Sequence, residues 1–423
     1  MASLTSQWIK TKATKAGVRL KAFLSPTNAV NRWAAFKSAK LERAKEVDQL
    51  NSGLSTAAAS GNVKEVERLL LDPRCEPRTP SGINGMTALM QAAMRGRAEC
   101  VQLLIPVSNP EARSQSETTA LMWAAMNGHA DCVSLLLPVS AAGARWDQND
   151  RTALIHAAGS GSAACCALLL PTSDPMAQDD RGHTALMQSA YCGHSACVEL
   201  LLPVSNARYK NAEGNQALAC AAGTGDEASV KLLLPVSDPL SRDIEGQTAL
   251  MWAAQRGNAE CVKLILSVSQ GVPKTYQNNE ALMHAAAYGH TACIELLLPV
   301  SDALSKDGKG RTALMYAAYG MHRACIELLL PVSDALSKDE KGRTALMNAA
   351  GGGRLTCVQL LLGVSDGGAK DGEDMMACDH ARLARHDELA DFMEAHATAL
   401  SERADLAKCT VSALSQKTSA LRL

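Results

Sequence analysis

Apolar residues recur along most of the chain at the spacing of short helices, and the pattern repeats with a fixed period. The string Thr-Ala-Leu starts seven units, and Gln-Ala-Leu at Gln216 and Glu-Ala-Leu at Glu280 fill the two gaps between them. Successive starts lie 32 residues apart, with one step of 33. A fixed period of about 20–50 residues is the signature of a repeat architecture. The seven threonines are Thr87, Thr119, Thr152, Thr184, Thr248, Thr312 and Thr344.

Each period predicts two short helices and a loop. In the unit that starts at Thr119, the threonine hydroxyl can cap the first helix, and Gly128 can end it in the left-handed region. The second helix, ADCVSLLL, has apolar residues at helical spacing. Pro138 should end it, because proline lacks the N–H and clashes with the preceding turn. The loop then closes with Asp-x-x-Gly, a turn sequence that recurs in several units.

These units resemble ankyrin repeats. The pattern TALMxAAxxGHxxCVxLLL is similar to the family pattern TPLHxAAxxGHxxxVxxLL, and D-x-x-G-x-T is similar to the family's hairpin loop. The resemblance implies an all-α repeat solenoid of stacked helix-turn-helix units joined by hairpin loops. Two departures recur: methionine stands at the family's motif histidine, as in Met122, and the unit is one residue shorter after the second helix. The Thr-Ala-Leu-Met motif of these units is also similar to that of the ankyrin-only proteins of diplomonad protists.

The repeats divide the chain into three parts. Residues 1–51 are expected to form a basic, helical N-terminal extension. Residues 52–394 are expected to hold an ankyrin-repeat array of about eleven units, because degenerate units at 54–71 and 376–393 flank the nine regular ones. Residues 395–423 are expected to be a polar C-terminal tail or helix.

Composition and charge argue against several classes of protein. Only 14 of 423 residues are aromatic, although 47% are hydrophobic, which suits close packing of helices better than of sheets. The 42 basic and 43 acidic residues balance, so charge gives no indication of a nucleic-acid partner. No run of 18 apolar residues occurs, and the N-terminus lacks the apolar core of a signal peptide. We therefore expect no transmembrane segment and no secretion.

Cysteine is frequent and periodic. Equivalent positions on stacked helices lie about 8–10 Å apart, which is too far for disulfides and for the ligands of one zinc ion. We interpret these cysteines as small buried apolar residues, and so many reduced thiols favour the cytoplasm. The eight that share one repeat position, named here the cysteine ladder, are Cys100, Cys132, Cys165, Cys197, Cys261, Cys293, Cys325 and Cys357.

Enzyme chemistry finds no support in the motifs. His129, His194, His290 and His322 adjoin the glycine between the helices, where the family histidine is structural, and no carboxylate or nucleophile recurs beside the other histidines. No phosphate-binding GxxxxGK[ST] loop and no complete dinucleotide-binding motif occurs. We expect no catalytic residue, no cofactor and no metal.

The first 50 residues differ from the rest in charge. Ten Lys and Arg against three acids give a net charge of +7, and Trp33 and Phe36 are among four aromatic residues there. One interpretation is a helix that packs its apolar stripe on the first repeat. A second is an amphipathic basic helix for an anionic membrane or filament surface. A third is disorder.

Binding should use exposed positions at which the repeats differ from one another. The fourth, seventh and eighth positions after the start of each unit vary, and by resemblance they line the concave face formed by the first helices. Aromatic residues and arginine are the usual anchors of protein interfaces. Trp123 and Trp252 have an alternative role as filling of the helix stack. The candidates are Trp123, Met126, Asn127, His156, Tyr191, Trp252, Arg256, His284, Tyr288, Tyr316 and Tyr319.

Two functions follow from these observations. The first is a non-enzymatic scaffold or adaptor that binds protein partners through the concave face and the loop tips, expected to be a monomer without nucleic-acid partners. The alternative is a structural tether, in which residues 1–50 contact an anionic membrane or the cytoskeleton and the repeats act as a spacer.

Overall fold

The computed structural model describes residues 26–81, 84–144, 147–268 and 276–399, with side chains from residue 33 onward. The chain divides into two compact units, Met1–Ala153 and Leu154–Leu423, each of which is described by itself. Both consist of helix pairs, and the described residues contain no strand, only one isolated bridge between Ser81 and Met86. The prediction of an all-α repeat solenoid is confirmed.

The first unit begins with a long helix that merges with the first repeat. Its C-terminal part packs on α3 and α4 and buries Leu54, Ala57 and Ala58. The remaining helices alternate as first and second members of each repeat. The elements are α2 (Pro26–Ser60), α3 (Val63–Leu70), α4 (Ala88–Met94), α5 (Ala98–Leu104), α6 (Ala120–Met126), α7 (Ala130–Leu136) and the 3₁₀ turn η1 (Leu137–Val139).

The second unit continues the same alternation. Its first helices are α8 (Ala153–Ser160), α10 (Ala185–Cys192), α12 (Ala217–Thr224), α14 (Ala249–Arg256), α16 (Tyr276–Tyr288), α18 (Ala313–Tyr319), α20 (Ala345–Gly352) and α22 (Ala377–Leu383). Ala153, the first residue of α8, is counted as the last residue of the first unit. Its second helices are α9 (Ala163–Leu169), α11 (Ser195–Leu201), α13 (Glu227–Leu233), α15 (Ala259–Val268), α17 (Thr291–Leu297), α19 (Arg323–Leu329) and α21 (Leu355–Leu362). Residues 387–399 are also helical. Turns of 3₁₀ type are η2 (Leu170–Thr172), η3 (Leu202–Val204), η4 (Leu298–Val300) and η5 (Leu330–Val332).

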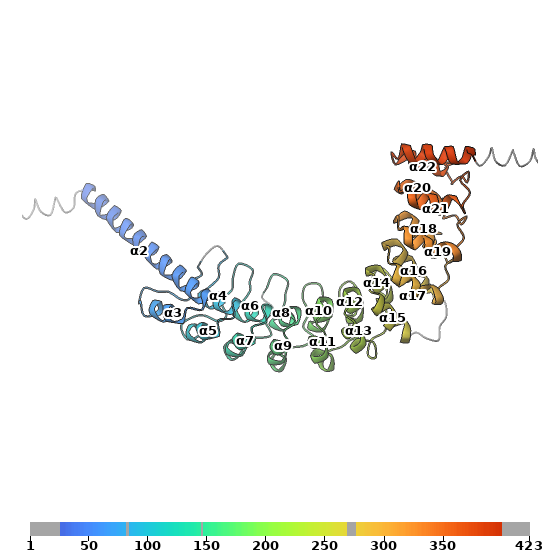
Figure 1. The fold of residues 1–423 in the computed structure, drawn as a ribbon. Helices are drawn as coiled ribbons and strands as arrows, with labels where there is room; N and C mark the ends of the chain where they lie inside the picture. Colours follow the sequence, from blue (N-terminus) through green and yellow to red (C-terminus); the bar gives the residue numbers. More distant parts are fainter. Residues whose placement is uncertain (1–25, 82–83, 145–146, 269–275, 400–423) are drawn as a thin grey trace, which may run out of the picture. The chain divides into compact units, whose positions relative to one another are not determined.

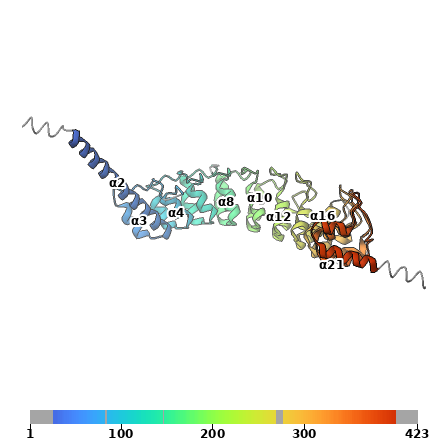
Figure 2. The same cartoon turned by 90° about the horizontal axis from the view of Figure 1, so that it is seen from above.

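Within each unit the helices form two layers. First helices of successive repeats lie side by side in one layer and second helices in the other (Figure 1). Paired alanines such as Ala317 and Ala318 are fully buried, so neighbouring helix backbones approach closely, and Leu314 and Met315 fill the space beside them. The loops before the first helices project from one edge of the layers (Figure 2).

Threonine caps the first helices as expected. The Thr312 hydroxyl accepts a hydrogen bond from the N–H of Met315, at 3.4 Å, and the same bond recurs in most regular units. The methionine that replaces the family histidine also takes part. Its sulfur accepts the N–H of the capping threonine in two units, from Thr248 to Met251 at 3.5 Å and from Thr344 to Met347 at 3.4 Å. Methionine thus supplies a weak acceptor that closes the cap.

The prolines after the second helices start a turn. Helix α7 ends at Leu136, as expected. Pro138 is the middle residue of the 3₁₀ turn η1, so the proline continues the chain into a turn after the helix. The proline ring suits the start of a helical turn, where its missing N–H would have no partner anyway. In five of the repeat units that the structure describes, the shortened connection is therefore a compact 3₁₀ turn.

The inter-helix histidines connect successive repeats. Nε2 of His129 lies 3.1 Å from the carbonyl oxygen of Met94, which belongs to the preceding repeat, and three further histidines make the same contact 35 residues back. Gly96 lies beneath the His129 ring at φ 70°, and a Cβ there would approach Nδ1 to 2.6 Å. The structural role predicted for these histidines agrees with this arrangement.

All eight residues of the cysteine ladder are buried, with exposed fractions of 0–1%. Burial raises the pKa of the Cys261, Cys293 and Cys325 thiols to about 11. The interpretation of the ladder as small buried residues is confirmed.

The hairpin loops are held by their aspartates and by each other. Asp243 accepts the N–H groups of Glu245 and Gln247, and the loops at 307, 339 and 371 repeat this turn. Neighbouring loops are joined by backbone hydrogen bonds, for example from Ile244 N–H to Glu213 O and from Glu340 N–H to Lys309 O. The repeat of α16 differs, because its first helix starts at Tyr276, five positions before the residue equivalent to the start of α18.

The N-terminal extension does not pack as one interpretation predicted. Trp33 and Phe36 are 66% and 68% exposed, and the side chains from 33 to 46 contribute nothing to the core. Figure 1 shows this half of α2 extending beyond the helices that follow it. Among the described residues, therefore, nothing covers the apolar side chains of residues 33–46. Trp8, Phe23 and residues 400–423 lie outside the described residues. The described helices include none that is long and apolar enough to cross a membrane.

Candidate functional site

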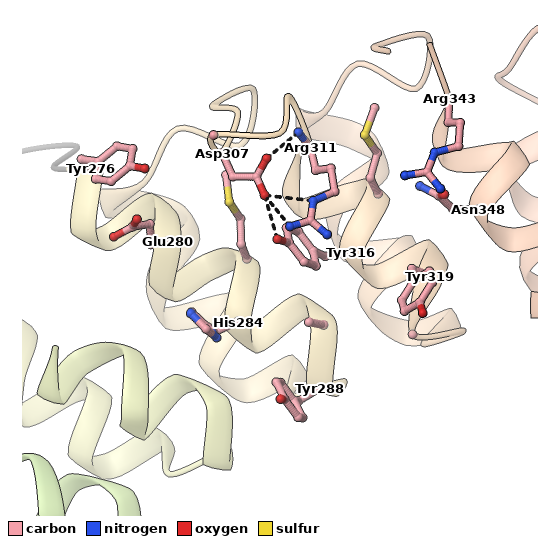
Figure 3. Close-up of a pocket in the computed structure, with 15 residues that line it drawn as sticks. Tyr276, Glu280, His284, Tyr288, Asp307, Arg311, Tyr316, Tyr319, Arg343 and Asn348 are labelled. Atoms are coloured by element: carbon pink, nitrogen blue, oxygen red, sulfur yellow. Dashed lines mark hydrogen bonds and ion pairs between the residues drawn. The ribbon is translucent and has the colours of Figure 1, made fainter. Parts of the chain in front are cut away.

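A groove in the second unit lies between α16, α18 and the loops beside them. Its volume is about 760 Å³. Figure 3 shows α16 on one side, α18 on the other, and the Asp307 loop above them. The residues that line it, called here the α16–α18 groove, are Tyr276, Glu280, Met283, His284, Ala287, Tyr288, Asp307, Gly308, Arg311, Met315, Tyr316, Tyr319, Gly320, Arg343 and Asn348.

The longer α16 forms one wall of this groove. Its additional N-terminal turn is held by amides against the segment after α17: Asn278 donates to Val300 O at 3.2 Å, and Asn279 accepts the N–H of Asp302 at 2.7 Å. Both asparagines are buried. The turn therefore has a fixed position, and it places Tyr276 and Glu280 on the groove wall.

Asp307 organises the loop above the groove. Its Oδ1 accepts the N–H groups of Lys309 and Arg311 at 2.9 and 2.8 Å. Its Oδ2 accepts Nε of Arg311 at 2.9 Å, Nη2 of Arg311 at 2.8 Å and the Tyr316 hydroxyl at 2.8 Å. Burial acts to raise the pKa of this carboxyl, but these hydrogen bonds outweigh it, so the pKa lies below its ordinary value.

Tyr316 and Arg311 line the groove directly beneath Asp307 (Figure 3). The guanidinium of Arg311 lies 4.5 Å from the centre of the Tyr316 ring, a cation–π contact. Burial and the hydrogen bond to Asp307 raise the pKa of Tyr316 well above its usual range. Burial also lowers the pKa of His284, which favours its neutral form.

Two further ion pairs border the groove. Nη2 of Arg343 lies 2.9 Å from Oδ2 of Asp339, and the Asp339 side chain is 2% exposed against 33% for Arg343. Nη2 of Arg242 lies 3.3 Å from Oε2 of Glu280. Each pair buries its carboxylate more deeply than its guanidinium.

Four of the candidate residues predicted from sequence come together here. His284 and Tyr288 lie on α16, and Tyr316 and Tyr319 on α18, all lining the same groove. Tyr288 and Tyr319 are 53% and 73% exposed, whereas Tyr316 and His284 are half-buried. The hydroxyl of Tyr288 also accepts a 2.9 Å hydrogen bond from the Gln255 amide.

The other candidates lie elsewhere. Met126 and Asn127 end α6 in the first unit and are exposed, as are Tyr191 on α10 and Arg256 on α14 in the second. The Tyr191 ring is 6.2 Å from that of His183. His156 is buried, with 7% exposed, so it offers little surface to a partner.

The two candidate tryptophans, Trp123 and Trp252, differ in their hydrogen bonding. Trp252 is half-buried, and its Nε1 donates to Asp243 at 3.0 Å, nine residues earlier in the hairpin loop. Tyr316 and Asp307 have the same spacing, as do His380 and Asp371 at 2.8 Å. Trp123 is also half-buried, but residue 114 is serine, and among the described residues the indole N–H of Trp123 has no hydrogen-bond partner.

The lining residues that sequence reasoning missed include Tyr276, Glu280, Asp307, Arg311 and Arg343. Asp307 was recognised only as a turn residue. The nine-residue spacing from loop aspartate to the fourth position of the next helix was available as a signal, as was the Asp-x-x-Gly-Arg sequence of the 307 and 339 loops. In the parts of the chain that the structure describes, no group of three or more His, Cys, Asp or Glu could hold a metal ion.

A family model described as ankyrin repeats (3 copies) matches residues 54–147, 106–179, 154–243, 218–307 and 282–374. The chain belongs to the ankyrin-repeat family. Ankyrin repeats generally mediate protein–protein interactions and are typically not enzymes. No curated protein matches this ankyrin-repeat protein significantly.

Proposed function

We propose that this ankyrin-repeat protein is a non-enzymatic scaffold or adaptor that binds protein partners through the face formed by its first helices. The observation that carries the proposal is the exposure of Tyr288 and Tyr319 at the α16–α18 groove, in a chain with only six tyrosines. Large aromatic side chains left exposed beside a hollow are typical anchors of an interface.

The same exposure recurs at the ends of other first helices. Met126 and Asn127 end α6, Tyr191 lies near the end of α10, and Arg256 is the last residue of α14. Arg256 has a second role, because a cation in the last turn of a helix is stabilised by the helix dipole. We include these positions as candidate partner contacts, and we leave out the buried His156.

Trp123, Trp252 and Tyr316 support the proposal less directly. Trp252 and Tyr316 hold the hairpin loops by bonds to Asp243 and Asp307, so their main contribution is to the shape of the face. Their half-exposed rings can still contact a partner. We also propose that the chain is a cytoplasmic monomer, similar to the ankyrin-only proteins of diplomonad protists.

The alternative is a tether, and the exposed half of α2 favours it. Trp33, Phe36 and Leu41 are exposed there beside Lys37, Lys40, Arg43 and Lys45. An aromatic and basic helix suits an anionic membrane or filament surface. This half of α2 makes the N-terminal segment a candidate contact for such a surface.

Deletion of residues 1–46 separates the two functions. The array should keep its fold, because the buried residues of α2 begin at Asn51. A scaffold would retain the proteins it captures and would not depend on anionic vesicles or filaments. If the deletion abolishes both the capture of proteins and the sedimentation with vesicles or filaments, the tether is the function.

A further inference from the structure

The charged groups of the α16–α18 groove present cations outward and hold anions inward. The Asp307 side chain is 15% exposed against 31% for Arg311, and the Asp339 side chain is 2% exposed against 33% for Arg343. In Figure 3 the guanidinium of Arg343 lies beside Asn348, across from Tyr316. A ligand in the groove therefore meets N–H donors before it meets carboxylate acceptors.

The carboxylate of Asp307 is also saturated. Asp307 accepts five N–H or O–H groups, whereas a carboxylate has about four lone-pair sites. Glu280 is 22% exposed and is paired with Arg242 at 3.3 Å. A lysine or arginine of a partner would therefore find no open acceptor on Asp307, and the charge of Glu280 is already balanced by Arg242.

The guanidinium groups keep donors for a ligand. Asp307 engages Nε and Nη2 of Arg311, and Asp339 engages Nε and Nη2 of Arg343, so the two Nη1 groups take no part in these pairs. Stacking on Tyr316 fixes the plane of the Arg311 guanidinium. Planar, preoriented guanidinium groups are suited to bind carboxylates.

Aromatic surface lies at one margin of the groove, below these cations (Figure 3). The exposed rings of Tyr288 and Tyr319 come from neighbouring repeats and stand at the lower margin of the groove (Figure 3). Such rings can hold apolar or aromatic side chains of a peptide.

We propose that the α16–α18 groove binds an acidic peptide segment of a protein partner, with its carboxylates on Arg311 and Arg343 and its apolar side chains against Tyr288 and Tyr319. This inference rests on the proposed scaffold function and specifies the chemistry of the partner.

Selection from a random peptide library displayed on phage, with the full chain as bait, tests the proposal. Selected peptides should be enriched in Asp and Glu together with Leu, Phe or Trp. Their binding, measured by fluorescence anisotropy with the synthetic peptides, should weaken between about 0.05 M and 0.5 M NaCl, because salt screens exposed charges.

Substitution of the exposed Tyr319 provides a matched pair that leaves the core untouched. Tyr319→Glu and Tyr319→Lys both remove the ring, but only the first repels an acidic peptide. The lysine variant should bind the selected peptides at least about tenfold more tightly than the glutamate variant. Arg343→Gln should weaken binding about tenfold, whereas Arg323→Gln on α19, outside the groove, should leave it unchanged.

The outcomes distinguish this inference from the scaffold function. Neutral or basic selected peptides, or equal binding by the two Tyr319 variants, would overturn the acidic-peptide proposal. If captured proteins still depend on Tyr288 and Tyr319 in that case, the scaffold function stands. If neither peptide nor protein binding depends on these tyrosines, both fall. Thermal melting of Arg343→Gln shows whether a loss of peptide binding comes from unfolding. If it does, the comparison of Tyr319→Lys with Tyr319→Glu decides the acidic-peptide proposal.

Discussion

At the scale of single residues, the loop aspartates connect the hairpin loops to the first helices. Asp243, Asp307 and Asp371 each accept a bond from a side chain nine residues later, and the donor is a different residue type in each case. The position tolerates tryptophan, tyrosine and histidine because all three carry an N–H or O–H at the required reach. Variation at this position therefore preserves the structure while it changes the surface.

Ser114→Asp should stabilise the first unit. Ser114 already accepts the N–H of Thr118, as the aspartates do in other loops, but it has no second oxygen for the indole of Trp123. An aspartate would supply that acceptor to a buried donor, for a gain of about 1 kcal/mol in the free energy of unfolding. Denaturant melting measures it, and Trp123→Phe should remove most of the gain; an equal gain in both backgrounds would refute the assignment.

Asp307→Asn should change the stability of the second unit with pH. Because the pKa of Asp307 is lower in the folded chain than the ordinary value of about 3.9, its ionised form stabilises the fold above pH 4. That contribution is lost as pH falls through the folded pKa. The variant should be less stable at neutral pH and should lose less stability on acidification below about pH 4. Urea melts across this range test it, and Tyr316→Phe should give an intermediate profile.

At the scale of elements, most of each repeat could be predicted from its sequence. The sequence correctly predicted the caps at Thr87 and its equivalents, the helix end at Gly128 and the burial of the cysteine ladder. These features depend on short-range spacing. The methionine sulfur as cap acceptor was not predicted, since Met251 appeared only as the loss of a histidine. The exposure of Trp33 and Phe36 was left open among three interpretations, because an apolar stripe does not reveal whether anything packs on it.

The repeat that starts at Gln216 should open before the repeat that starts at Thr312. Helix α12 has no side-chain cap bond, and Ala219 replaces a buried methionine. The Gln216 amide offsets part of this loss by bonding Arg208 O at 3.2 Å and Asp238 N–H at 3.4 Å. Weaker contacts with neighbouring repeats lower local stability, so hydrogen exchange in 217–233 should be faster than in 313–329. Equal protection of the two segments would contradict this.

At the scale of the whole molecule, the candidate surface depends on residues from several repeats. The sequence alone identified His284, Tyr288, Tyr316 and Tyr319, because variable positions and aromatic residues stand out against the repeat. It did not bring Arg311 and Arg343 to them, since these arginines lie in loops and meet the helices only when the repeats stack. A single repeat read by itself contains no groove.

The central claim is that exposed tyrosines of the α16–α18 groove bind partners, whereas the cysteine ladder holds the stack. The most direct measurement compares melting and partner capture, quantified by mass spectrometry, for Tyr288→Ala with Tyr319→Ala and for Leu304→Ala with Leu336→Ala. The leucines are similarly exposed and lie outside the groove. Cys293→Asp serves as the unfolding reference, because it buries an unpaired charge.

The account predicts that the tyrosine pair melts within about 0.5 kcal/mol of the native chain but loses its partners. The leucine pair should keep both stability and partners, and Cys293→Asp should lose both. The contrary result is a tyrosine pair that lowers stability as much as Cys293→Asp while partner capture is intact, which would make these aromatic residues part of the core and not of a binding face.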